Sequence, residues 1–387
     1  DVAPSRGLGD VYKRQSLLSR VSCKFIGGVF KMKLNKRIIG IGLVAVAVVG
    51  LVACARGGRG GSAADSKVRA AIITDSAGVD DKSFNQSAWE GLQAWGKANK
   101  LEKDSGYTYF QSNSESDFAT NLSSAVDQNY NLIFGVSFRL HDAISESAKD
   151  NEKINYVIID DVIKDQKNVE SVLFADNEGA YLAGIAAAMQ SQNKKVGFIG
   201  GQKSDTITRF EAGFTAGAKS VKPDIDVQVQ YAESFNDAAK GSTIASTMYA
   251  SGADVIYQAA GGTGTGVFTA AKEINEKLSA DSNKKVWVIG VDRDQSAEGN
   301  YTSSDKKKSN FVLTSTIKQV GTVVKDIAND QVKGKEFEGG KIKTYGIKDG
   351  GVDIVTSSLP SDIKDAVVKA KDQIKNGELK PTDGLSK

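Results

Sequence analysis

The sequence predicts an α/β protein with two doubly wound lobes joined by a hinge that the chain crosses several times. From residue 67 onward, short apolar runs alternate with amphipathic segments of helical spacing, and this alternation starts again at residue 176. No proline falls within an expected strand. Strands separated by helices of about 10–15 residues give right-handed crossovers and parallel sheets. Two such runs in tandem predict two open sheets.

The first run opens with an apolar strand that ends abruptly in Thr74-Asp75, and a polar loop then leads into a helix that begins near Phe84. This strand–loop–helix arrangement is how open α/β sheets present ligand groups at their carboxyl ends. The expected strands are 68–74, 107–111, 132–136, 155–160 and 171–174, and the expected helices are 83–97, 117–128 and 140–149.

The second run has a similar size. Its expected helices are 177–190, 206–220, 237–251 and 264–279, and its expected strands are 195–199, 226–231, 254–258 and 285–291. A further strand at 309–314, a helix at 317–333, a hairpin of 341–345 with 352–354, and a helix at 361–375 complete the chain. Because this tail is too long for one capping helix, we expect lobe I to comprise 67–175 plus 316–338, and lobe II 176–315 plus 339–387.

The composition is that of an ordinary globular protein. The chain has 387 residues, of which 40% are hydrophobic, so it is long enough for two domains. Its net charge of +3 is close to balance. A nucleic-acid-binding protein would concentrate Lys and Arg on one face, so no nucleic-acid partner is expected.

The front of the chain contains an export signal. Met32 is the first methionine, and basic residues follow it before an apolar run at 38–52 that closes in Leu51-Val-Ala-Cys54. The run has roughly 15 apolar residues, fewer than the ~20 that span a bilayer. Leu-Val-Ala-Cys resembles the lipobox of bacterial lipoproteins, in which the Cys carries diacylglycerol. An uncut transmembrane anchor is the alternative, but small residues just before Cys54 favour lipidation.

We therefore expect residues 32–53 to be a lipoprotein signal peptide and residues 1–31 to be a spurious leader without a role in the mature protein. Residues 54–66 are rich in Gly and Arg and are expected to form a flexible tether. Cys23 lies in the leader and Cys54 would be lipidated, so the exported domain is expected to have neither disulfide nor thiol chemistry.

Acids and glycines stand at the ends of the expected strands. They are Asp75, Gly135-Val-Ser-Phe138, Asp160-Asp161, Gly200-Gly201, the segment from Gln258 to Gly266, and Gly290-Val-Asp-Arg-Asp294. Because the carboxyl ends of parallel strands share one edge of a sheet, these groups are expected to meet in a cleft. Any single Asp or Gly could instead be a turn or capping residue. The set as a whole favours a ligand in the cleft.

Few residues could support catalysis or hold a cofactor. His141 is the only histidine, which removes most nucleophile–base pairs and most transition-metal sites. The glycine-rich segment Gly261-Gly-Thr-Gly-Thr-Gly266 is followed by no Lys, so it is not a P-loop, and it fits an approach of backbone to an uncharged ligand. We expect no cofactor, no metal and no catalytic residue.

One enzyme interpretation stays open. Asp75-Ser-Ala-Gly-Val-Asp-Asp81 is similar to the N-terminal motif of nucleoside hydrolases, whose carboxylates hold Ca²⁺. The fit is partial, because Ala77 replaces the proline of that motif. Ca²⁺ takes six to eight oxygen ligands, and this loop supplies too few alone. Asp80 and Asp81 are more simply explained as turn and helix-capping residues.

From Lys67 onward, nearly the whole chain resembles the Bmp (basic membrane protein) family of bacterial lipoproteins, specifically its purine nucleoside receptors. The motifs that carry the resemblance occur in order: Thr74 to Gln86, Gly135 to Phe138, Ile158 to Asp161, Phe174 to Gly184, Val196 to Gly201, Ala260 to Gly264, Val288 to Asp292 and Thr316 to Lys318.

The resemblance implies a type I periplasmic-binding-protein fold that clamps its ligand between two lobes and performs no chemistry. It also implies a monomer on the outer face of the bacterial cell membrane, attached by its lipid anchor, that delivers guanosine, inosine or adenosine to the permease and ATPase of an ABC importer. A receptor of the same fold for another small ligand, such as a sugar, is the second alternative.

The resemblance also assigns roles to residues. It implies that Phe84 stacks on the purine, where an aromatic face contributes ~1–3 kcal/mol per base. The other implied ligand residues are Asp75 and Asp160 at the polar edge of the base, Asn85 beside them, Asp292 and Lys318 at the ribose hydroxyls, and Gly261 and Gly262 at the sugar.

Several of these assignments have alternatives. The second stacking residue could be Gln258, Tyr257 or Phe235. Asp161 could contact the ligand in place of Asp160. Phe84 could fasten its helix to the sheet, and Lys318 could be a solvated helix residue.

Overall fold

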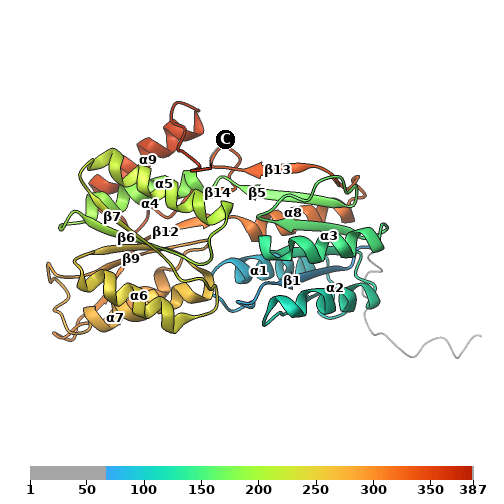
Figure 1. Cartoon of the computed structure of the whole chain (residues 1–387), viewed down its shortest axis with the longest axis horizontal. Coiled ribbons are helices and arrows are strands. Elements are labelled where there is room, and N and C mark those ends of the chain that lie inside the picture. Colours follow the sequence, from blue (N-terminus) through green and yellow to red (C-terminus); the bar gives the residue numbers. More distant parts are fainter. Residues whose placement is uncertain (1–66, 386–387) are drawn as a thin grey trace, which may run out of the picture. The chain divides into compact units, whose positions relative to one another are not determined.

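The computed structural model describes residues 67–385 (Figure 1). Three expected segments lie outside the described residues: the leader at 1–31, the signal peptide at 32–53, and the tether at 54–66. The expected lipidation of Cys54 lies there as well. Within 67–385, no helix is both long and apolar enough to cross a bilayer.

A six-stranded parallel sheet in the order β13-β5-β4-β3-β1-β2 is built mostly from the first half of the chain. Its strands are β1 (Ala70–Thr74), β2 (Tyr107–Phe110), β3 (Leu132–Val136), β4 (Asn155–Ile159), β5 (Val169–Phe174) and β13 (Ile342–Tyr345). Its helices are α1 (Phe84–Ala98), α2 (Phe118–Asp127), α3 (His141–Asp150) and α8 (Val320–Val332). We refer to this sheet with these helices as lobe I.

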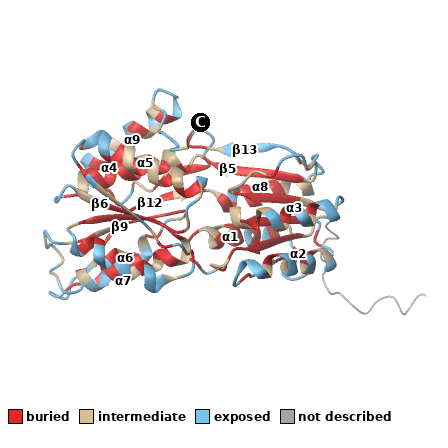
Figure 2. Cartoon of the chain, viewed as in Figure 1, coloured by how far each residue is buried: buried red, intermediate tan, exposed pale blue. Residues whose placement is uncertain are grey.

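The two faces of this sheet are covered by different helices. Ala70 and Ile72 pack with residues of α1 and α8, whereas Ala71 and Ile73 pack with residues of α2 and α3. Because side chains alternate along a strand, a run that is apolar at every position is what a sheet covered on both faces requires. The apolar runs read from the sequence therefore end up buried on both sides (Figure 2).

The second half repeats this arrangement in a sheet of order β14-β12-β9-β8-β6-β7, in which only β14 runs antiparallel to its neighbour. The strands are β6 (Lys195–Gly200), β7 (Asp226–Tyr231), β8 (Val255–Ala259), β9 (Trp287–Gly290), β12 (Val312–Lys318) and β14 (Val352–Ile354). The helices are α4 (Asp176–Gln190), α5 (Asp205–Val221), α6 (Ala238–Ala250), α7 (Thr265–Asn275) and α9 (Ser361–Lys375). We refer to this sheet with these helices as lobe II.

The strand orders of the two sheets correspond position by position. Strand β4 of lobe I occupies the place of β9 in lobe II, and β5 the place of β12. A short antiparallel pair, β10 (Asn300–Thr302) with β11 (Lys308–Asn310), lies outside both sheets. The α/β class and the two doubly wound lobes predicted from the sequence are confirmed.

The chain passes between the lobes at the end of β5, at the end of β12, and between β13 and β14. Backbone bonds join these crossings: the Ala175 N–H donates to the Tyr345 carbonyl at 2.9 Å, and the Gln319 N–H donates to the Gly351 carbonyl at 2.9 Å. The crossings therefore form one hydrogen-bonded hinge.

The expected hairpin of 341–345 with 352–354 is wrong. Strand β13 pairs with β5 in lobe I, and β14 pairs with β12 in lobe II. The turn-forming glycines between them mark a crossing of the hinge, so the two strands find partners far away in sequence. The residue ranges of the lobes stay a prediction, and the pairing of β13 argues for placing 342–345 in lobe I.

The expected helix at 317–333 starts too early. Strand β12 continues to Lys318, and α8 begins at Val320. The expected strand at 309–314 is in fact divided between β11 and β12, with Phe311 between them. These shifts matter for the site, because they place Lys318 at the end of a strand.

Helix α8 crosses α1 at very close range. A Cβ at Gly91 would lie 2.1 Å from the Gly321 carbonyl oxygen, so the two helices meet backbone to backbone. Helix α1 begins at Phe84, and α8 follows the hinge directly. This contact therefore fixes the position of a predicted ligand residue relative to the hinge.

We expect Gly91→Ala to lower the free energy of unfolding by about 1–3 kcal/mol, because overpacking between the backbones outweighs the better helix propensity of alanine. Urea unfolding followed by circular dichroism measures the change. Ala94→Ser, on the exposed face of the same helix, should change it by less than about 0.5 kcal/mol. Equal effects of the two substitutions would contradict the close approach.

Candidate functional site

A cavity with about 480 Å³ of empty space lies where the carboxyl ends of both sheets face each other. All the ligand residues predicted from the sequence line it except Gln258 and Gly262. The predicted residues that line the cavity are Asp75, Phe84, Asn85, Asp160, Gly261, Asp292 and Lys318.

Asp75 follows β1 and is held by its neighbours. Its Oδ1 accepts from the Ala77 N–H at 2.9 Å and from Asn85 Nδ2 at 2.8 Å, and Asn85 Oδ1 accepts from the Asp75 N–H at 3.2 Å. Burial raises the pKa of Asp75 to about 6, although the bonds from Ala77 and Asn85 oppose the shift. Its other oxygen, Oδ2, takes no part in these bonds.

Asp81 caps helix α1, as the sequence predicted. Its carboxylate accepts from the backbone N–H groups of Ser83, Asn85 and Gln86 at 2.8–3.0 Å. These bonds satisfy N–H groups at the start of the helix, which have no partners within it. They also fix where Phe84 and Asn85 enter the cavity, whereas Asp80 is exposed. Asp81 therefore serves the site by holding the helix start.

Asp160 and Asp292 occupy equivalent places in the two lobes. Asp160 follows β4 with φ at +71°, and Asp292 lies in the loop after β9 with φ at +67°. Non-glycine residues rarely adopt this left-handed backbone, and such residues gather at functional sites. The repeated fold thus turns one carboxylate from each sheet toward the same space.

Lys318 is the cation of the site. Its Nζ lies 2.6 Å from Asp160 Oδ2 and 3.2 Å from Asp176 Oδ1, and the side chain is only 3% exposed. The same Nζ lies 5.0 Å from the Phe84 ring and 5.5 Å from the Phe210 ring, within cation–π range. Burial would lower the pKa of Lys318, but the surrounding carboxylates outweigh burial and raise it. Lys318 is therefore not a solvated helix residue.

Asp292 completes this charged group. Its Oδ2 accepts from Ser83 Oγ at 2.5 Å, and its backbone carbonyl accepts from the Lys318 N–H at 2.9 Å. Burial raises the pKa of Asp292 to about 6, with Lys318 opposing the shift. Asp160 Oδ1 is buried and has no hydrogen-bond partner within residues 67–385. A buried acceptor without a donor is costly, so this atom indicates a ligand that donates.

Aromatic rings form the apolar part of the cavity. Phe84, Phe138, Phe210 and Phe235 line it, and the Phe138 and Phe235 rings meet edge to face with centroids 6.2 Å apart. A Cβ at Gly201 would lie 2.1 Å from the Phe235 ring, so glycine is required there. Planar apolar surfaces beside carboxylates suit a flat ligand that carries N–H or O–H donors.

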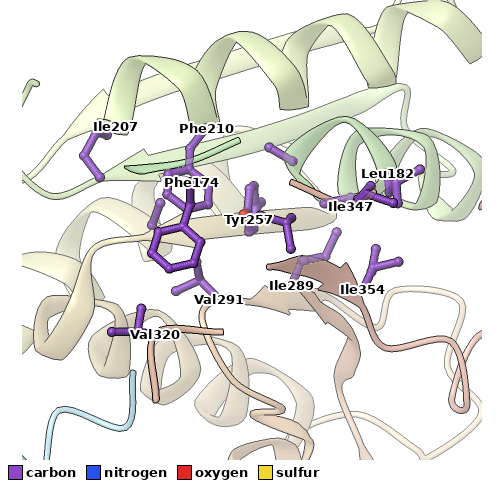
Figure 3. Packing of buried hydrophobic residues seen from close by; sticks show 14 of the residues in the cluster. Phe174, Leu182, Ile207, Phe210, Tyr257, Ile289, Val291, Val320, Ile347 and Ile354 are labelled. Atoms are coloured by element: carbon purple, nitrogen blue, oxygen red, sulfur yellow. The ribbon is translucent and has the colours of Figure 1, made fainter. Parts of the chain in front are cut away.

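Of the three candidates for the second stacking residue, only Phe235 lines the cavity. The Tyr257 ring is fully buried in the hydrophobic core (Figure 3), with its centroid 5.3 Å from that of Phe214 and 6.2 Å from that of Phe210. Its Oη lies 2.8 Å from Thr316 Oγ1.

The Gln258 prediction needs correction. Its side chain is fully buried, donates from Nε2 to Gln295 Oε1 at 2.9 Å, and accepts from the Ala260 N–H at 3.2 Å. The Gln258 side chain therefore supports the start of the glycine loop from within the core. Gly262 also lies outside the lining, where a Cβ would meet the Phe235 carbonyl at 3.1 Å.

Asp161 points elsewhere than Asp160. Its Oδ2 lies 2.8 Å from His141 Nδ1, and its Oδ1 accepts from the Val162 N–H at 2.7 Å. Neither Asp161 nor His141 lines the cavity. Within the described residues, no group of three or more His, Cys, Asp or Glu side chains is arranged to hold a metal ion.

The residues in or beside the cavity that were missed from the sequence include Phe138, Phe210 and Asp176. Phe138 stood in a strand-end motif but was given no role, and Phe210 lies one turn into α5, where no sequence signal distinguishes it. Asp176, at the start of α4, pairs with Lys318. Its position just after a strand was the available signal, but an acid in the first helical turn is usually explained by the helix dipole.

The fold and the site are those of a two-lobed solute-binding protein. The sequence matches the Bmp family, described as ABC transporter substrate-binding protein PnrA-like, over residues 67–382, and the chain belongs to this family. Its relatives are substrate-binding proteins and not enzymes, so the hydrolase interpretation is not retained.

Similar proteins cover most of the chain. The ABC transporter nucleoside-binding protein BmpA of Lactococcus lactis subsp. cremoris is 58% identical over 89% of this chain and 99% of its own length. The CD4+ T-cell-stimulating antigen of Listeria monocytogenes is 50% identical over 80% of this chain and 87% of its own. A solute-binding protein structure from Aeropyrum pernix superposes with a TM-score of 0.68 at 24% identity, over 81% of this chain and 92% of that one.

The raised pKa of Asp75 predicts a pH dependence of stability. Because the folded protein holds this proton more tightly than the unfolded chain, Asp75 contributes its full stability below about pH 4, and this is lost as the pH rises through about 6. Asp75→Asn should abolish that contribution.

Urea unfolding without ligand at pH 4.5 and pH 7.5 tests this prediction. The free energy of unfolding of Asp75→Asn, relative to the native protein, should rise between the two pH values by on the order of 2 kcal/mol. Asp80→Asn, at an exposed carboxylate, should show no such rise. A difference that stays constant with pH for Asp75→Asn would contradict burial of an ionisable Asp75.

Proposed function

We propose that the protein captures purine nucleosides outside the cell and delivers them to an ABC importer. The observation that carries this proposal is the combination in one cavity of aromatic faces with buried carboxylates from both lobes. One carboxylate oxygen, Asp160 Oδ1, has no donor within residues 67–385. The most similar relative described above, at 58% identity, is by its description a nucleoside-binding protein.

The base would lie against Phe84, with Phe235 as the partner on the opposite face. Asp75, held by Asn85, would accept hydrogen bonds from the edge of the base. Guanine and hypoxanthine present a ring N–H, and adenine presents an exocyclic amino group, so all three offer donors to a carboxylate. Asp292 and Lys318 would bind the ribose hydroxyls, the first accepting and the second donating.

The charge of the cavity favours a nucleoside over a nucleotide. Asp160, Asp176 and Asp292 surround the ammonium group of Lys318. Asp75 and Asp81 are two further carboxylates that line the cavity. A phosphate placed among these buried carboxylates would be repelled in a medium of low dielectric constant. Uncharged ligands with several hydroxyl or N–H donors avoid this cost.

Contacts between the lobes suit a clamp that closes over its ligand. Gln295 Nε2 of lobe II donates to the Lys82 carbonyl of lobe I at 2.9 Å, and Arg293 pairs with Glu90 at 3.2 Å. Opening of the hinge would break these bonds together with the bond between Ser83 and Asp292. Closure around ligand is the usual movement of such binding proteins.

The partners and location follow from the same proposal. The protein would act as a monomer that presents its closed form to the permease and ATPase of the importer. Leu51-Val-Ala-Cys54 supports attachment to the outer face of the membrane through a lipid on Cys54. A receptor for a sugar is the alternative, which the first experiment addresses.

Isothermal titration calorimetry tests the ligand class. The ligands are inosine, guanosine, adenosine, cytidine, guanosine 5′-monophosphate and ribose. The purine nucleosides should bind at least tenfold more tightly than the monophosphate and than ribose, a difference of ~1.4 kcal/mol or more. Tightest binding of ribose or the monophosphate would overturn the proposal. The rank of cytidine decides whether the preference is for purines or for nucleosides in general.

Substitutions in the cavity test the site. Phe84→Ala and Asp292→Ala should each weaken inosine binding at least tenfold, because one removes a stacking face and the other removes an acceptor for the ribose. Phe337→Ala is the matched control, since Phe337 is half-buried but lies outside the cavity. Native affinity in both cavity variants would reject this site.

A further inference from the structure

Asp176 is a buried carboxylate to which the proposed recognition of nucleosides gives no role. It is the first residue of α4, directly after the chain has left β5, and it is 2% exposed. It does not line the cavity. Its two carboxylate oxygens lie 3.2 and 3.3 Å from Lys318 Nζ. The ammonium group is therefore held between Asp160 on the cavity side and Asp176 on the hinge side.

This arrangement restricts the direction of the Lys318 ammonium. An ammonium group has three N–H donors, and the two carboxylates can take two of them. The rings of Phe84, Phe174 and Phe210 lie 5.0–5.5 Å from Nζ and limit its movement on other sides. One donor is left for a ligand, and its direction depends on both carboxylates.

Asp176 also belongs to the hinge. Two residues further along α4, Glu178 Oε2 accepts from the Ile347 N–H at 2.7 Å. Ile347 lies in the crossing between β13 and β14. The first turn of α4 thus contacts two other crossings, through Asp176 to the end of β12 and through Glu178 to Ile347. Only the Asp176 contact reaches a residue of the cavity.

We propose that Asp176 is a positioning residue that aims Lys318 at the ribose hydroxyls and so makes the site select ribonucleosides over deoxyribonucleosides. The inference rests on the proposed function. A site built to bind a hydroxyl group rejects an analogue that lacks it, because a buried polar group then loses its partner. That rejection requires the donor to be fixed. Without its contact to Asp176, the Lys318 ammonium can turn wholly toward Asp160. The Asp160 carboxylate then accepts its hydrogen bonds, and no ligand is needed.

Titration with adenosine, 2′-deoxyadenosine and 3′-deoxyadenosine tests the inference. The native protein should bind adenosine at least tenfold more tightly than at least one of the deoxy ligands. In Asp176→Asn, which keeps the size of the side chain, that ratio should fall below about threefold. Asp176→Ser removes the same charge and is judged by the same criterion, so that a folding defect in one variant does not end the test.

Glu178→Gln is the matched control, because it removes a neighbouring half-buried carboxylate that binds the hinge but not Lys318. It should keep the native ratio, whatever its effect on overall affinity. An unchanged ratio in the folded Asp176 variants would overturn the inference and leave Asp176 a structural hinge residue. If the native protein binds none of the three ligands, the proposed function fails instead. If the native protein binds both deoxy ligands as tightly as adenosine, the inference is also overturned.

Discussion

A single buried ammonium group, that of Lys318, organises the centre of this protein. It lies at the end of the last long strand of lobe II, between Asp160 of lobe I and Asp176 at the hinge. Buried carboxylates repel one another and are costly to remove from water, so this cluster depends on its one cation. Lys318 therefore compensates charge from both lobes at the point where the chain passes between them.

The repeated fold explains how these groups meet. Strands β4 and β9 hold equivalent places in their sheets, and each is followed by an aspartate with left-handed backbone. Two sheets whose carboxyl ends face one cavity thus supply matching acceptors from opposite sides. The aromatic rings come from helix starts and loops, which vary more freely than the strands and can set the shape of the ligand.

Much of this could be predicted from the sequence because it depends on local pattern. Strands buried on both faces are continuous apolar runs, and the acids that end them lie at one edge of each sheet by geometry alone. What depends on distant partners could not be predicted. The glycines after Tyr345 indicate a turn equally well within a hairpin or at a hinge crossing. Tyr257 and Gln258 both precede the glycine loop, and only the packing of the core shows that neither reaches the cavity. Asp176 has the same local signal as any acid at a helix start, and its role follows from Lys318 being beside it.

A crystal structure of the protein in complex with inosine would show whether the ligand binds around Lys318. We expect an intact nucleoside between the lobes, with its base against Phe84 and its ribose hydroxyls within hydrogen-bond distance of Asp292 and Lys318. A donor of the ligand should also lie within reach of Asp160 Oδ1. A nucleoside bound outside this cavity, or one bound there with its ribose away from Lys318, would rule out this site.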